Sequence, residues 1–184
     1  MRTSLFILLI ALTVLFGCKD AKKSNTNLSI TVVDSTAVLY SNHLAHEFSD
    51  HLEKDSFKIS ITGKTILTGQ VKFEIKSANG EILLNETFPS YYLLGDSEYV
   101  ERTDQQKEEW IKKRVDEFFN EDNFHQPAIT NPKFDEDYSN KDIWEEIAVD
   151  KTAIGFFYLV GEEDGRQIAY SKKQKKVVMY FNCC

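Results

Sequence analysis

Apolar and polar residues alternate along two stretches in the first half of the chain. Phe57, Ile59 and Ile61 alternate with polar residues, and the same period of two recurs in 71–76. This period, with β-branched residues at the apolar positions, is typical of strands that bury one face. Asn79-Gly80 favours a tight hairpin turn after 71–76, which makes 81–88 the returning strand. The pattern therefore predicts strands over 56–62, 71–76 and 81–88.

The apolar spacing becomes helical between residues 103 and 120. Apolar side chains recur there three or four positions apart: Ile111, Val115, Phe118 and Phe119. Two glutamates each precede a lysine by four positions, which stabilises a helix surface: Glu108 with Lys112 and Glu109 with Lys113. A second, short helix is predicted over 142–149, with Asn140 or Asp142 as its N-cap.

Two continuous apolar runs, 156–160 and 177–181, lie near the end of the chain. With 166–171 between them and turn-forming residues in both connections, they predict a three-stranded antiparallel meander. Strands, then helices, then strands are typical of an α+β fold. We therefore expect an antiparallel β-sheet, built from the N-terminal hairpin and the C-terminal meander, packed with one long helix and one or two short ones.

The chain begins with an apolar run that ends at a cysteine. After Met1-Arg2, every residue from 5 to 16 is apolar except Thr13, and this run is too short for a bilayer, which needs about 20 apolar residues. A basic start and a short apolar stretch are typical of an export signal. Leu15-Phe16-Gly17-Cys18 resembles the lipobox of bacterial lipoproteins, which implies removal of residues 1–17 and lipid on the Cys18 thiol. An ordinary secretory signal or a buried apolar element are the alternatives.

Polar residues follow Cys18 directly. The stretch 19–27 has too few apolar side chains to order itself, so residues 18–27 are predicted to be the lipidated cysteine and a flexible tether, which would span roughly 15 to 18 Å. Residues 28–184 are predicted to form a single globular α+β domain. In enteric lipoproteins an aspartate after the cysteine marks the inner membrane; Lys19 stands there in this chain, so the resemblance implies an outer-membrane location.

Net charge and the motifs that the sequence lacks reduce the classes of function to consider. The formal net charge of −7 makes nucleic acid an unsuitable partner, because phosphate backbones require a basic surface. The chain contains no Gly-x-Ser-x-Gly elbow, phosphate-binding glycine loop or dinucleotide fingerprint. It resembles the small uncharacterised envelope lipoproteins of Bacteroidota-type bacteria. We expect a non-enzymatic module on the membrane that binds an envelope protein or a small ligand, without a cofactor, through an exposed aromatic or sheet-edge patch.

Three of the four histidines lie close together, with acidic residues among them. If 38–53 is a helix, His43, His46, Glu47 and Asp50 share one face, because positions three, four and seven apart stack. Imidazole and carboxylate ligands on one face suit zinc, with His43, His46 and Asp50 as the site. The alternative function is therefore a zinc-binding protein or a metal-dependent hydrolase. A solvated polar helix face would produce the same spacing.

A second acidic stretch resembles the calcium loop of an EF-hand. Oxygen ligands stand at its first, third, fifth and twelfth places: Asp135, Asp137, Ser139 and Glu146. Asn140 stands where the loop normally has glycine. The alternative is a helix start rich in acidic and capping residues.

The chain ends in two adjacent cysteines, Cys183 and Cys184. A disulfide between them is possible but strained, because neighbouring Cα atoms lie about 3.8 Å apart. Unoxidised thiols, links to another chain and simple packing of a terminal strand are the alternatives.

Overall fold

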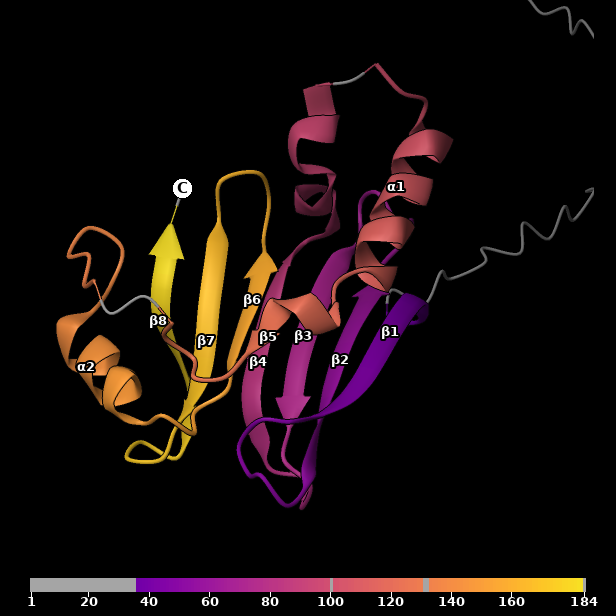
Figure 1. Ribbon diagram of the computed structural model, residues 1–184. Coiled ribbons are helices and arrows are strands. Elements are labelled where there is room, and N and C mark those ends of the chain that lie inside the picture. The colour runs from indigo at the N-terminus through magenta and orange to yellow at the C-terminus, as the bar shows by residue number, and fades with distance from the viewer. Residues whose placement is uncertain (1–35, 100, 131–132, 184) are drawn as a thin grey trace, which may run out of the picture. The chain divides into compact units, whose positions relative to one another are not determined.

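The computed structural model describes residues 36–99, 101–130 and 133–183, all within one compact unit, Val33–Cys184. Its first half is a four-stranded antiparallel sheet in the order β1-β2-β3-β4 (Figure 1). The strands are β1 (Val38–Glu47), β2 (Lys54–Thr62), β3 (Gln70–Lys76) and β4 (Ile82–Pro89). Gly80 has a φ of 89°, as the predicted turn between β3 and β4 requires.

A second antiparallel sheet contains the last strands, in the order β5-β6-β7-β8. They are β5 (Phe124–His125), β6 (Gly155–Leu159), β7 (Gly165–Ser171) and β8 (Lys176–Cys183). The three long strands are the predicted meander. β5 has only two residues, which pair with the first two residues of β6, Phe156 and Gly155.

Two α-helices and two 3₁₀ segments complete the described chain: α1 (Asp104–Asp116), α2 (Lys141–Val149), η1 (Ser90–Tyr99) and η2 (Glu121–Asn123). Thr103 caps α1 through a capping box with Gln106. Asn140 caps α2, since its Oδ1 accepts a hydrogen bond from Ile143 N at 3.2 Å.

One aromatic cluster joins the two sheets and α1. Phe57 of β2 is fully buried, and its ring centroid lies 5.5 Å from that of Phe156 on β6 and 6.0 Å from that of Phe119, after α1. Ile111 and Val115 of α1 belong to the same core. The other face of the second sheet packs against α2 in a smaller cluster: Ala128, Ile147, Ala153, Ala169, Val178 and Tyr180. α1 thus covers one face of the first sheet, and α2 covers one face of the second.

The predicted α+β class is confirmed, with two separate antiparallel sheets. The helix hypothesised over 38–53 is wrong, because β1 and the start of β2 occupy that range. β5 was not predicted. The i,i+4 pairs expected on α1 are replaced by other contacts: Lys112 Nζ lies 2.8 Å from Glu109 and Lys113 Nζ 3.8 Å from Glu117.

The predicted signal and tether, including Cys18, lie outside the described residues. In the part of the chain that is described, no helix is both long and apolar enough to span a bilayer.

Candidate functional site

The histidine cluster does not have the geometry that the zinc hypothesis required. On a strand, residues three apart point to opposite faces, so His43 lies on the exposed face of the first sheet and His46 on the other. His46 stacks on Phe124 with ring centroids 3.9 Å apart. Asp50 lies beyond the strand, where its Oδ1 accepts a hydrogen bond from Leu52 N. No group of three or more His, Cys, Asp or Glu among the described residues is placed to hold a metal ion.

The EF-hand resemblance is likewise not matched by the geometry. Asp135 Oδ1 accepts a hydrogen bond from Asp137 N at 3.1 Å, and Glu146 on α2 accepts one from Ser171 Oγ on β7. Ser139 Oγ is buried. These residues form a turn and a helix start, which is the alternative given above for the calcium loop. Cys183 ends β8, half-buried, and Cys184 lies outside the described residues.

A groove lies between α1, η2 and β6. It consists of two adjoining cavities of about 400 and 170 Å³ that share Arg114 and Leu159 as lining residues. The larger cavity is further lined by Glu117, Asn120, Asn123 and Phe157. The smaller one is lined by Trp110, Glu162 and residues 93–95 of η1. We call these two cavities the Arg114 groove.

Arg114 is the central cation of this groove. The side chain is half-buried on α1, and in the described parts of the chain no carboxylate lies within ion-pair distance and no acceptor within hydrogen-bond distance of its guanidinium. This contrasts with Arg166, whose guanidinium binds two carboxylates. A guanidinium offers five N–H donors in a planar fork that fits a carboxylate. The groove therefore presents unused donors at its centre.

Aromatic and amide side chains flank Arg114. The Trp110 ring is half-buried against the core, and the Arg102 guanidinium lies 4.8 Å from the ring centroid. Asn120 caps η2 through its side-chain oxygen, and the Asn123 amide approaches the Phe118 carbonyl at 3.5 Å. Rigid aromatic walls with a few polar groups are typical of ligand sites.

The edge of β6 forms one wall of the groove. β5 pairs with Gly155 and Phe156 alone, so no strand of the described chain lies beside Phe157–Leu159 on that side. η2, which directly precedes β5, contacts β6 beyond this pairing. Val160 N donates to Asp164 O across the β6–β7 hairpin at 2.9 Å. Because backbone groups alternate along a strand, the N–H and C=O of Leu159 point the other way, toward the groove.

A charged network behind the groove joins the two sheets. Arg166 on β7 donates to Asp164 and to Glu86 on β4, and the Tyr158 hydroxyl donates to Glu86 Oε2 at 2.8 Å. Asn182 Nδ2 donates to Asp164 Oδ1 at 2.9 Å. Burial raises the pKa of Tyr158, so its hydroxyl remains a donor at neutral pH. Each carboxylate here has an internal partner, and the network therefore stabilises the contact between the sheets.

Comparison with protein families, with curated proteins and with solved structures finds no match. The groove residues were not predicted from the sequence either. Arg114 follows the apolar stripe of α1, and Phe157 belongs to an apolar run. Neither carries a local signal of binding, because the groove exists only where α1, η2 and β6 meet.

Proposed function

We propose that this chain is a lipid-anchored, non-enzymatic binding module of the cell envelope, whose Arg114 groove binds an extended peptide segment bearing a carboxylate. The observation that carries the proposal is the position of Arg114. It lines both cavities of the groove, and the described residues provide it with no anionic partner. The lipobox resemblance at Leu15-Phe16-Gly17-Cys18 supports the anchor.

The Arg114 guanidinium favours a carboxylate ligand. A guanidinium binds a carboxylate through two parallel hydrogen bonds, which are shorter and stronger than neutral ones. Glu117 lines the larger cavity, but its Oε1 lies 3.8 Å from Lys113 Nζ, on the surface of α1. Glu162 lines the smaller cavity as well. An acidic side chain or a C-terminal carboxylate of a ligand would bind the Arg114 guanidinium, for which the described residues provide no ion pair.

The strand edge favours an extended peptide. η2 directly precedes β5 and contacts β6, so the edge is open only toward Leu159. A peptide can add to β6 at that end, because the backbone N–H and C=O of Leu159 point away from β7. Strand addition of this kind obtains affinity from main-chain hydrogen bonds and specificity from side-chain pockets. Phe157 and Trp110 would provide apolar contacts on either side of Arg114.

Binding of short random peptides tests this function. A synthetic library with free C-terminal carboxylates is selected on the immobilised protein, and the affinities of the enriched peptides are measured by fluorescence anisotropy. We expect the enriched peptides to carry a carboxylate and to bind Arg114→Gln about tenfold more weakly, which is about 1.4 kcal/mol. Lys107→Gln is the matched control, since it removes one positive charge from α1 outside the groove lining.

Backbone methylation of the peptide separates the two parts of the proposal. N-methyl groups at alternate residues remove the donors that a strand needs, so they should abolish binding if the peptide adds to β6. Equal affinities of wild type and Arg114→Gln for every enriched peptide would contradict the role of Arg114. Retained affinity of the methylated peptides would contradict strand addition.

A further inference from the structure

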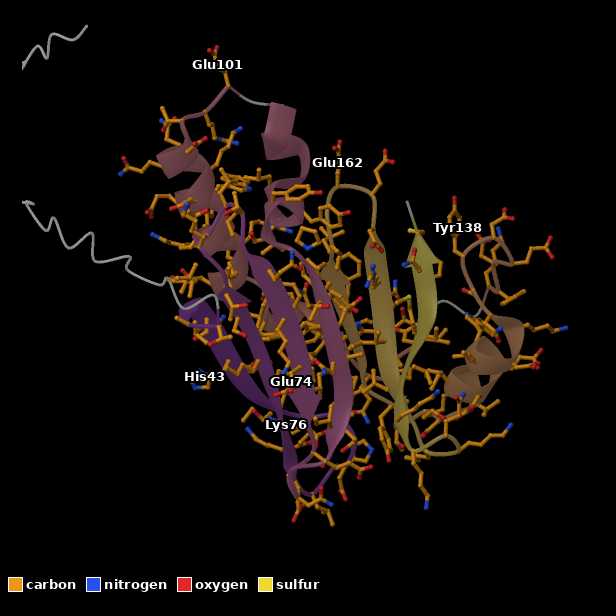
Figure 2. All side chains as sticks on the ribbon, turned by 180° about the vertical axis from the view of Figure 1, so that it is seen from behind. His43, Glu74, Lys76, Glu101, Tyr138 and Glu162 are labelled. Carbon is orange, nitrogen blue, oxygen red and sulfur yellow. The ribbon has the colours of Figure 1, made fainter. Side chains whose placement is uncertain are left out.

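The first sheet has one face that no helix of the described residues covers. α1 packs on the face that carries Phe57 and Phe73, and alternation places the even-numbered residues of β2 and β3 on the other. Figure 2 shows His43, Glu74 and Lys76 on this uncovered side. Small polar side chains complete the face: Ser41, Ser56, Ser60, Asn85 and Thr87.

Lysines dominate the charge of this face. Lys58 is the cross-strand neighbour of Glu74, and Lys72 and Lys76 each place Nζ 2.7 Å from one Glu74 oxygen. The hydrogen bond from Lys72, followed in size by that from Lys76, lowers the pKa of Glu74, so the Glu74 carboxylate stays charged. At the end of the sheet, Lys54 stands opposite Glu47. The face thus carries four lysines against two glutamates, in a chain with 22 basic and 29 acidic residues.

Exposed aliphatic side chains lie at one end of the same sheet. Ile82 pairs with Lys76 across β3 and β4 and is 55% exposed. Leu52, in the turn between β1 and β2, is 92% exposed. Both turns lie at the same end of the sheet because its strands are antiparallel. Protruding aliphatic groups beside lysines are typical of proteins that lie on a membrane interface.

We propose that this face, the lysine face (Lys58, Lys72 and Lys76 with Leu52 and Ile82), docks on the anionic headgroups of the bilayer that carries the lipid anchor. The proposal rests on the proposed anchor, which keeps the domain close to the bilayer. Lysines near an anionic leaflet gain electrostatic attraction that decays within about 10 Å at moderate salt. Because Lys58, Lys72 and Lys76 share one face of the sheet, they can reach the headgroups together, while Leu52 and Ile82 enter the interface.

Lysine acetylation on vesicles tests the docking. The full lipidated chain is reconstituted in vesicles of phosphatidylcholine alone or mixed with phosphatidylglycerol, and acetylation rates of single lysines are measured by mass spectrometry. We expect about threefold or greater slowing at Lys58, Lys72 and Lys76 in the anionic vesicles, reversed by high salt. Lys113 and Lys141, with side chains 58% and 69% exposed on the helices, are the internal references and should keep their rates.

Matched variants show whether the slowing comes from this face. Lys58→Gln/Lys76→Gln should remove the remaining protection of Lys72, whereas Lys141→Gln/Lys151→Gln, with the same change in charge, should not. Equal rates in both vesicle types, or slowing of all lysines alike, would overturn the docking. Soluble polyphosphate, added to the protein on neutral vesicles, is the control for a polyanion that is not a lipid. If it slows acetylation of these lysines as strongly as the anionic vesicles do, the assignment to lipid is overturned.

A separate experiment tests whether the chain is anchored by lipid at all. Flotation with neutral vesicles reports the lipid alone, since neutral headgroups offer no charge to the lysines. Loss of flotation in Cys18→Ala supports the anchor, and a wild-type chain that does not float contradicts it whatever the acetylation pattern. Peptide binding in the Arg114 groove is measured without vesicles, so its outcome is independent of both.

Discussion

Removal of the Glu86 carboxylate should destabilise the contact between the two sheets. Glu86 stands on β4 of the first sheet and accepts hydrogen bonds from Arg166 and Tyr158 of the second. Its side chain is 22% exposed and that of Arg166 is 18% exposed. In Glu86→Ala the Tyr158 hydroxyl loses its acceptor while it stays buried, and Arg166 keeps only Asp164.

The magnitude follows from these two losses. A buried hydroxyl without a partner costs about 1–3 kcal/mol, and a hydrogen bond to a charged group contributes about 1.5–3 kcal/mol. Because Arg166 keeps Asp164 and the site is partly exposed, we expect about 3 kcal/mol in total for Glu86→Ala. Glu86→Gln keeps an acceptor for Tyr158 and loses only the charge, so it should cost about 1–1.5 kcal/mol. At this chain length the alanine variant should melt roughly 6–12 °C lower.

Urea unfolding followed by tryptophan fluorescence measures these values, since Trp110 and Trp144 lie on different helices. The control is Glu109→Ala, which removes a surface pair whose glutamate is 63% exposed and should cost under about 0.5 kcal/mol. Tyr158→Phe completes a double-mutant cycle with Glu86→Ala, and a coupling of about 1 kcal/mol is expected. A cost for Glu86→Ala no larger than that of Glu109→Ala would refute the reasoning.

Two further predictions concern the core and pH. Phe57→Ala should lower the free energy of unfolding by about 3–5 kcal/mol, because Phe57 is fully buried and its ring contacts five other rings. The exposed control Leu52→Ala should change it by less than about 0.5 kcal/mol. Equal shifts of the urea midpoint in the two variants would contradict this prediction. Burial alone would raise the pKa of Asp150, but hydrogen bonds from Lys172 and Thr152 outweigh it and lower the pKa to about 2. Since the folded pKa is depressed, the stabilisation is present above pH 4 and is lost as pH falls toward 2. Because solvent screens Lys172, this stabilisation is limited to about 1 kcal/mol. When unfolding is measured as a function of pH, the stability of Asp150→Asn should lack the loss between pH 4 and pH 2 that the wild type shows, apart from losses at other groups.

The elements with one regular period could be predicted from the sequence. β2, β3 and the three long strands of the second sheet alternate or form apolar runs, and α1 has a helical stripe that packs in the core. Local preference and tertiary packing agree in these segments. Their existence and type were therefore predictable, with strand ends displaced by at most two residues and the end of α1 by four.

β1 was missed because polar side chains occupy inward positions of the strand. Asn42 faces α1, where its Nδ2 donates to the carbonyls of Val115 and Asp116 at 3.0 Å each. The Tyr40 hydroxyl donates to the Asp116 carboxylate at 2.9 Å. The two bonds from Asn42 satisfy backbone carbonyls at the end of α1. The alternation of β1 is thus completed by a helix that lies far along the chain, which no local pattern indicates.

The Arg114 groove and the lysine face differ in how far the sequence indicates them. Lysines 58, 72 and 76 stand at polar positions of predicted strands, so their shared face follows once the strand register is known. The groove needs α1, η2 and the open end of β6 together, and the short β5 that exposes this edge has no periodic signal in two residues.

The positions of the two surfaces lead to a last prediction. Arg114 belongs to α1, which packs on the inner face of the first sheet through Ile111 and Val115, whereas Lys72 and Lys76 lie on the opposite face. A domain docked through the lysine face would therefore hold the groove away from the bilayer. Peptides selected on the groove should bind the protein on anionic and neutral vesicles with affinities that agree within about twofold, because separate surfaces have a coupling free energy near zero. A tenfold weaker affinity on anionic vesicles, measured by anisotropy, would mean that docking obstructs the groove and that the two surfaces cannot act together.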